Sequence, residues 1–284
     1  MNTIRSTKLA LCLVASVLCW TSSSTAYLSM PSEPIAHKVG AADCVVLGKI
    51  TAIQANSMPG QVYRYSPTPQ MAFTIVEVEV QESLYGLKDM KQVRFGFRDV
   101  KAYKPNLAVG QTGYFCGVQV GMNAFYIVPL HCFCEQNDPS FAKDLASARR
   151  LGRLMGDPER GLNAKDADER LLTAYLLLLR RCYVPWRHGE PGKTQPLDAE
   201  QSKLILLALA GADWNKHRLE VRDAVAALQL AVKFGAPVLK DFPPNQADEG
   251  WPAAAKQWLK ENAASYRIHR LLKGNRPEDT KGAK

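Results

Sequence analysis

The sequence predicts an α+β protein in which a small β-barrel comes first and a helical region follows. Up to residue 130 the apolar residues fall in short runs that alternate with a period of two, which is typical of strands. After Ser140 they recur at the spacing of amphipathic helices. The chain has 284 residues, of which 46% are hydrophobic and 22% charged, so it can form about two domains with buried cores.

The clearest strand is the run 72–80, around which the barrel half is organised. Three valines starting at Val76 alternate with Glu77 and Glu79, so the valines face one side of a sheet and the carboxylates the other. β-branched residues suit a pleated, half-buried surface. We expect a central antiparallel strand with one wet face, on which the two glutamates are solvated rather than a pair for acid–base catalysis.

Four further runs indicate strands, at 43–53, 92–97, 111–118 and 124–130. The first contains Gly48, which predicts a bulge or a sharp bend inside the strand. Five strands, a glycine-bent first strand and no predicted helix before residue 140 favour a five-stranded Greek-key barrel of the oligonucleotide/oligosaccharide-binding (OB) type. A β-sandwich is the alternative.

The second half of the chain predicts a small α-helical domain. Helices are expected at 141–155, 166–182, 199–210, 218–234 and 253–272. Ser140 and Asp198 can cap the first and third helices, and Pro252 suits the first turn of the last. The predicted organisation is a barrel over 27–137, a helical domain over 138–273 and a disordered tail over 274–284.

Segment 1–26 has the three-part layout of a secretory signal peptide. Arg5 and Lys8 precede a short apolar run, and a small polar stretch follows, which predicts cleavage before Tyr27. The apolar run is short for a transmembrane helix, and no later stretch is apolar enough to be one. Cys19 offers a lipoprotein alternative, which the leucine before it disfavours. We therefore expect a secreted or periplasmic protein without a transmembrane segment.

The formal net charge of +9 is spread along the chain. Segment 27–137 has 9 basic and 8 acidic residues, and segment 138–284 has 25 and 19. Nucleic-acid-binding proteins cluster basic residues on one element, so this pattern argues against a nucleic-acid partner. No Gly-x-Ser-x-Gly, His-Glu-x-x-His or phosphate-loop motif is present. We expect no catalytic residue and no cofactor, and a partner that is an unknown protein or an extracellular polymer.

The stretch 42–50, Ala-Asp-Cys-Val-Val-Leu-Gly-Lys-Ile, resembles the opening strand of netrin-type modules. These modules include the inhibitory domain of tissue inhibitors of metalloproteinases. The strand at 76–80, followed by Leu-Tyr-Gly at 84–86, looks like their second strand and turn, and 107–115 looks like their fourth strand. The resemblance covers about 41–130 and implies an OB-type barrel. The whole arrangement looks like that of secreted bacterial proteins in which such a barrel precedes a helical region.

The zinc-chelating chemistry of those inhibitors does not carry over to this sequence. They bind the protease zinc through the amine and carbonyl of an N-terminal cysteine. Here the processed chain should begin at Tyr27, and its first cysteine, Cys44, falls inside a predicted strand. No residue of this chain inherits that role.

Five cysteines follow the predicted signal peptide. The barrel half contains four disulfide candidates, Cys44, Cys116, Cys132 and Cys134, and export implies an oxidising compartment. We expect Cys116 to pair with Cys132 or Cys134, because these flank adjacent strands, and Cys44 is a candidate for the other. Cys182, in the helical half, is expected to be a buried thiol.

His131, Cys132 and Cys134 form a compact group of soft ligands. Imidazole and thiolate suit copper and zinc. Cys-x-Cys spacing also recurs in disulfide frameworks, and a fourth ligand is missing nearby. The group carries the alternative prediction, a metal- or redox-linked envelope protein.

Several aromatic residues of the barrel half form a possible binding platform. They are Tyr63, Tyr65, Phe95, Phe97, Tyr103 and Tyr126. Barrels use such side chains to stack sugars or single strands, but a small core needs them as well. The leading prediction is a secreted or periplasmic non-catalytic binding protein.

Overall fold

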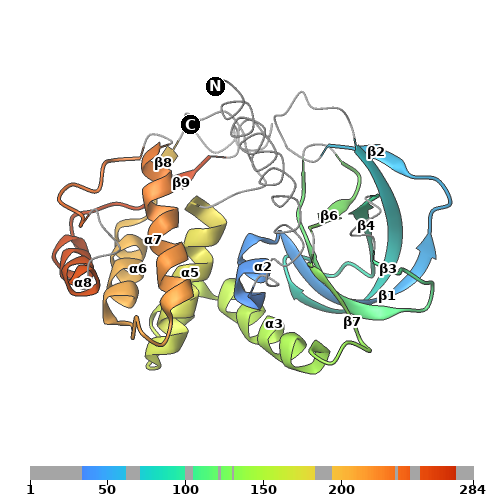
Figure 1. Ribbon diagram of the computed structural model, residues 1–284, viewed down its shortest axis with the longest axis horizontal. Helices are drawn as coiled ribbons and strands as arrows, with labels where there is room; N and C mark the ends of the chain where they lie inside the picture. The colour runs from blue at the N-terminus through green and yellow to red at the C-terminus, as the bar shows by residue number, and fades with distance from the viewer. Residues whose placement is uncertain are drawn as a thin grey trace, which may run out of the picture. The chain divides into compact units, whose positions relative to one another are not determined.

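The computed structural model describes residues 34–61, 71–99, 105–120, 123–129, 131–182, 194–233, 236–243 and 250–272. The predicted α+β class is confirmed: a curled mixed sheet comes first and helices follow (Figure 1). Within these ranges no helix is long and apolar enough to cross a membrane. The predicted signal peptide and C-terminal tail lie outside the described residues.

The sheet is formed by β1 (Cys44–Ile53), β2 (Met58–Gly60), β3 (Met71–Tyr85), β4 (Gln92–Arg98), β5 (Thr112–Gly117), β6 (Tyr126–Val128) and β7 (Phe133–Glu135). Its order is β6-β4-β3-β1-β5-β7, with β2 on β3, and only the β4–β6 pair is parallel. Just beyond β5, Val118 and Ile127 of β6 donate backbone hydrogen bonds to each other, both 2.8 Å long. The sheet therefore curls until β6 meets the chain beyond β5.

The predicted central strand is confirmed as β3, which is longer than expected. Val76 and Val78 are fully buried and Glu79 is exposed, as their alternation predicts. The pairing of β1 with β3 shifts register between Leu47 and Gly48. A Cβ at Gly48 would lie 2.4 Å from Val78 Cγ1, so the close approach of the two strands requires glycine at this bend.

The described helices are α2 (Ile35–Ala41), α3 (Phe141–Gly156), α4 (Pro158–Leu162), α5 (Ala167–Cys182), α6 (Ala199–Gly211), α7 (Arg218–Lys233) and α8 (Trp251–Asn262). The expectation of no helix before residue 140 is wrong, because α2 precedes the sheet. A Cβ at Gly40 of α2 would lie 2.9 Å from Leu179 Cδ1 of α5. This seven-residue helix is thus stabilised by packing rather than by a local pattern.

The predicted helix over 253–272 is correct only in its first part. After α8 the chain forms β9 (His269–Leu271), which pairs with β8 (Thr194–Pro196) in a separate two-stranded sheet. Ile268 is fully buried, and its carbonyl accepts a 2.7 Å hydrogen bond from the Leu197 amide. Pairing with a distant segment therefore replaces the last turns of the expected helix.

Of the two predicted N-cap residues, Asp198 caps its helix and Ser140 does not. The Asp198 carboxylate caps α6 by accepting from the amides of Glu200 and Gln201, at 2.8 and 3.1 Å. The Ser140 hydroxyl instead donates to Asp144 Oδ2 at 3.0 Å and does not cap α3. The start of α3 is as predicted, but the role of Ser140 is not.

Two close contacts join β3 to α3. Arg149 of α3 donates to both carboxylate oxygens of Glu82, with its Nε 3.1 and 3.0 Å away. A Cβ at Gly152 would lie only 2.3 Å from the Leu84 carbonyl oxygen. The described residues from Pro34 onward belong to one compact unit, while the predicted boundary between residues 137 and 138 stays a prediction.

We predict that Gly152→Ala destabilises the protein by about 1–3 kcal/mol, because the added methyl group overpacks the contact with the β3 backbone. Urea unfolding at neutral pH measures the change. Gly156→Ala is the matched control, since nothing lies within 4 Å of a Cβ at that position. It should be neutral or stabilising by up to about 1 kcal/mol. Equal stability of the two variants would contradict the close packing of α3 on β3.

Candidate functional site

The outer surface of β3 and β4 is the candidate binding surface. We call it the β3–β4 face and define it by Glu77, Glu79, Gln92, Arg94 and Arg98. Glu77 lies opposite Arg94 and Glu79 opposite Gln92 in the register of the two strands. Glu79 and Gln92 are exposed, and the other three are half-buried. The face thus presents hydrogen-bond acceptors on one strand beside guanidinium groups on the next.

Apolar side chains support this face from one end. Phe73 and Ile75 of β3 pack with Phe125 and Ile127 in a small core cluster separate from the main core. A Cβ at Gly96, between the two arginines, would lie 2.4 Å from the Phe125 ring. The backbone of β4 therefore lies directly against this ring, and glycine is required there.

The predicted aromatic platform is only partly within the described structure. Phe97 is 4% exposed, and its ring meets those of Phe115 and Phe133 with centroids 6.4 and 5.8 Å away. Tyr126 is half-buried, 6.1 Å from the fully buried Phe95. These residues fill the core side of the sheet. Three other platform candidates lie outside the described residues: Tyr63, Tyr65 and Tyr103.

The structure distinguishes between the two cysteines expected to pair with Cys116. The β5–β7 register places Cys134 opposite Tyr114. One step further along, the Cys116 amide donates a 2.8 Å hydrogen bond to the Cys132 carbonyl. Cys132 is thus the nearer cross-strand neighbour of Cys116. All five described cysteines, including Cys44 and Cys182, are buried thiols, and the disulfide pairing stays a prediction.

Burial also determines the reactivity of these thiols. It raises the pKa values of Cys44, Cys116 and Cys134, and it raises the pKa of Cys182 to about 12. Thiolates, not thiols, act as nucleophiles and metal ligands. At neutral pH these four side chains are therefore protonated thiols and poor nucleophiles.

The proposed metal group is divided between two environments. His131 is exposed, with a backbone φ of 61°, whereas Cys132 and Cys134 are buried at 4% and 8% exposure. Among the described residues, no three His, Cys, Asp or Glu side chains gather closely enough to hold a metal ion. The alternative prediction of a metal- or redox-linked protein stays untested, and these placements do not favour it.

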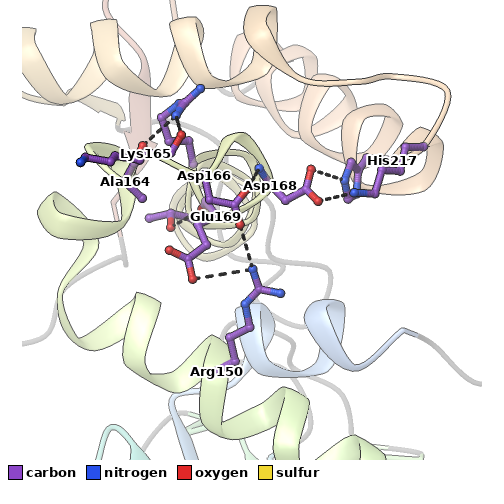
Figure 2. A network of polar contacts seen from close by, with 10 residues as sticks. Arg150, Ala164, Lys165, Asp166, Asp168, Glu169 and His217 are labelled. Carbon is purple, nitrogen blue, oxygen red and sulfur yellow. Dashed lines mark hydrogen bonds and ion pairs between the residues drawn. The ribbon is translucent and has the colours of Figure 1, made fainter.

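A polar network at the start of α5 was not expected from the sequence. Figure 2 shows Asp168 facing His217, whose Nε2 lies 2.9 Å from Asp168 Oδ1. Lys216 also donates to Asp168, and Arg150 of α3 lies 3.7 Å from both Asp166 and Glu169. Contacts of this kind link α3, α5 and the turn before α7.

The Asp168–His217 pair has the geometry of an orienting carboxylate and an imidazole. A nucleophile would have to lie within hydrogen-bond reach of His217, and no serine, threonine or cysteine side chain of the described residues bonds to it. The His217 side chain is 13% exposed. The pair joins residues 49 positions apart, so no local sequence signal could have revealed it, and it is best explained as a link between helices.

Comparisons with protein families and with curated proteins give no relative. No family model matches the chain, and a search of curated proteins finds no match. The candidate function therefore rests on the residues and topology of this chain.

We predict that Asp168 makes the protein more sensitive to acid. Hydrogen bonds from Lys216 and then from His217 lower the pKa of Asp168 below its ordinary value of 3.8. Its stabilising contribution is therefore complete above the ordinary value and is lost as the pH falls through the lower, folded-state pKa. Asp168→Asn should lower the free energy of unfolding at pH 7 and flatten its decline between about pH 5 and pH 2.

Urea unfolding across this pH range tests the prediction. Asp223→Asn is the control, because in the described part of the chain its carboxylate pairs only with the adjacent, largely exposed Arg222. The prediction fails if Asp168→Asn keeps the full pH dependence of the wild type.

Proposed function

We propose that this chain is an exported, non-catalytic binding protein built on a netrin-like OB-type barrel, with the β3–β4 face as its binding surface. The strand order carries the proposal. If β2 and β7 are set aside, the order of the remaining five strands is β6-β4-β3-β1-β5, and the Val118–Ile127 bridge links β5 back to β6. A five-stranded Greek-key barrel of the OB type is expected to have this closed order and its one parallel pair, β4 with β6.

The position of the face within this topology supports its role. OB-type barrels bind ligands over their second and third strands and the loops next to them. Here the corresponding strands are β3 and β4. The loop after β1 and the loop between β5 and β6 lead into this side of the barrel. Phe125 belongs to the apolar cluster at the Arg98 end of the face, and Met58 packs against that cluster.

Export and the family assignment are parts of the same proposal. Export is argued from the signal-like segment 1–26. The netrin-like assignment is argued from the motifs at 42–50 and 84–86. These two segments meet: a Cβ at Gly86, whose φ is +83°, would lie 2.0 Å from the Asp43 carbonyl oxygen. The glycine of the second motif is therefore required by the backbone of the first.

A blocking experiment tests the binding surface. Glu79→Cys places an exposed thiol on the β3–β4 face, and a maleimide-linked polyethylene glycol chain is attached to it. The modified protein is sedimented with a bacterial cell-envelope fraction. We expect unmodified protein to sediment saturably with the envelope and the blocked variant to lose about tenfold or more in apparent affinity.

The same modification of Arg153→Cys, an exposed position on α3, is the matched control and should leave binding unchanged. Wild-type protein treated with the reagent reports any reaction of the native thiols. Equal binding by both blocked variants would show that the β3–β4 face is not the binding surface. No saturable binding by the unmodified protein would contradict the proposed function.

A further inference from the structure

The two arginines of the β3–β4 face have unusually weak hydrogen-bond partners. Arg94 Nη2 donates to the sulfur of Met58 at 3.4 Å, and Arg98 Nη2 donates to the sulfur of Met71 at 3.1 Å. A thioether is a weak acceptor. The Nε atoms of both arginines are buried and have no hydrogen-bond partner among the described residues. Both charged groups therefore lack acceptors of the strength they normally find.

No described carboxylate provides the strong acceptor that these two guanidinium groups lack. Glu77 lies opposite Arg94 across the strand pair, yet neither arginine forms an ion pair within the described part of the chain. Guanidinium groups are always charged, and their flat arrangement of donors matches a planar oxyanion. Because the groups lie against an apolar cluster, an anion placed there would be attracted more strongly than at a fully hydrated surface.

We propose that the β3–β4 face binds a carboxylate-bearing saccharide, with Arg94 and Arg98 binding its carboxylate groups. This inference rests on the proposed function and specifies its ligand class. The two arginines are four residues apart on one strand, so their Cα atoms are separated by roughly 13 Å. An extended ligand could present one or two acidic groups to them.

The rest of the face favours a sugar acid over other anions. The oxygens of Glu77 and Glu79 can accept hydrogen bonds from the hydroxyl groups of a sugar, which a chain of phosphates or of acidic side chains does not offer. Phe73 and Phe125, on the same side of the sheet at the Arg98 end of the face, are buried, at 0% and 3% exposure, so they offer no surface on which nucleic-acid bases could stack. Both β3 and β4 have neighbouring strands on each side, which argues against an acidic peptide that adds to the sheet as a strand.

Binding of labelled oligogalacturonate to the full chain, measured by fluorescence anisotropy, tests this proposal. The neutral counterpart is an oligogalactoside of equal length. We expect a preference of at least about tenfold for the acidic sugar, and Arg94→Gln and Arg98→Gln should each weaken its binding by about tenfold. The conservative changes Arg94→Lys and Arg98→Lys keep the charge but lose the planar donor pair, so they should restore only part of the affinity.

Arg153→Gln, on the exposed surface of α3, is the control and should bind like the wild type. Circular dichroism and thermal unfolding establish whether each variant is folded. If a glutamine variant does not fold, the affinity of the corresponding lysine variant decides the test. The proposal is overturned if the neutral sugar binds as well, if the arginine variants keep full affinity, or if poly-glutamate or oligo-dT binds more tightly. If the sugar fails to bind but blocking residue 79 still abolishes envelope binding, the ligand class is wrong and the proposed function stands.

Discussion

The pairing of β3 with strands on both sides is the constraint on which the rest of the structure depends. One long strand pairs with β1 and β2 along one edge and with β4 along the other. Its register sends Val76 and Val78 into the core and Glu77 and Glu79 to the outer face. A shift of one residue would exchange these two sets, so the core and the β3–β4 face are determined together. The glycine bend in β1 allows the two strands to follow each other closely around the curl.

The same strand also connects the sheet to the helices. Beyond the β4 pairing, its last residues carry Glu82, which binds Arg149, and Leu84, whose carbonyl lies against Gly152. Tyr85 then lies under the guanidinium of Arg180 of α5, 5.1 Å from its ring centre, while Arg180 Nη1 donates to the Ala42 carbonyl at 2.6 Å. The helices therefore pack against the end of β3 opposite to the apolar cluster, and the β3–β4 face does not depend on them directly.

The sequence predicted those elements whose position is determined by a local residue pattern. Alternation identified β3, and the capping carboxylate of Asp198 identified the start of α6. The three-residue strands β2, β7, β8 and β9 were missed, because such short segments are strands only by virtue of their pairing. The arginines of the candidate site were also missed. Arg94 lies in the predicted strand 92–97, but Arg98 lies one residue beyond its predicted end. Their weak sulfur partners come from Met58 and Met71 in distant segments.

The closure of the sheet into a barrel is the central claim, and amide hydrogen exchange at Val118 and Ile127 tests it most directly. Each of these residues donates its amide to the carbonyl of the other at 2.8 Å. Without this pairing, Val118 would lie in the loop after β5 and Ile127 on the edge strand β6 of the sheet. If the barrel is closed, both amides should be protected to within about tenfold of the amides in the β3 ladder, because they open only with the barrel. Exchange of both at the rate of an unstructured peptide, with β3 still protected, would contradict closure.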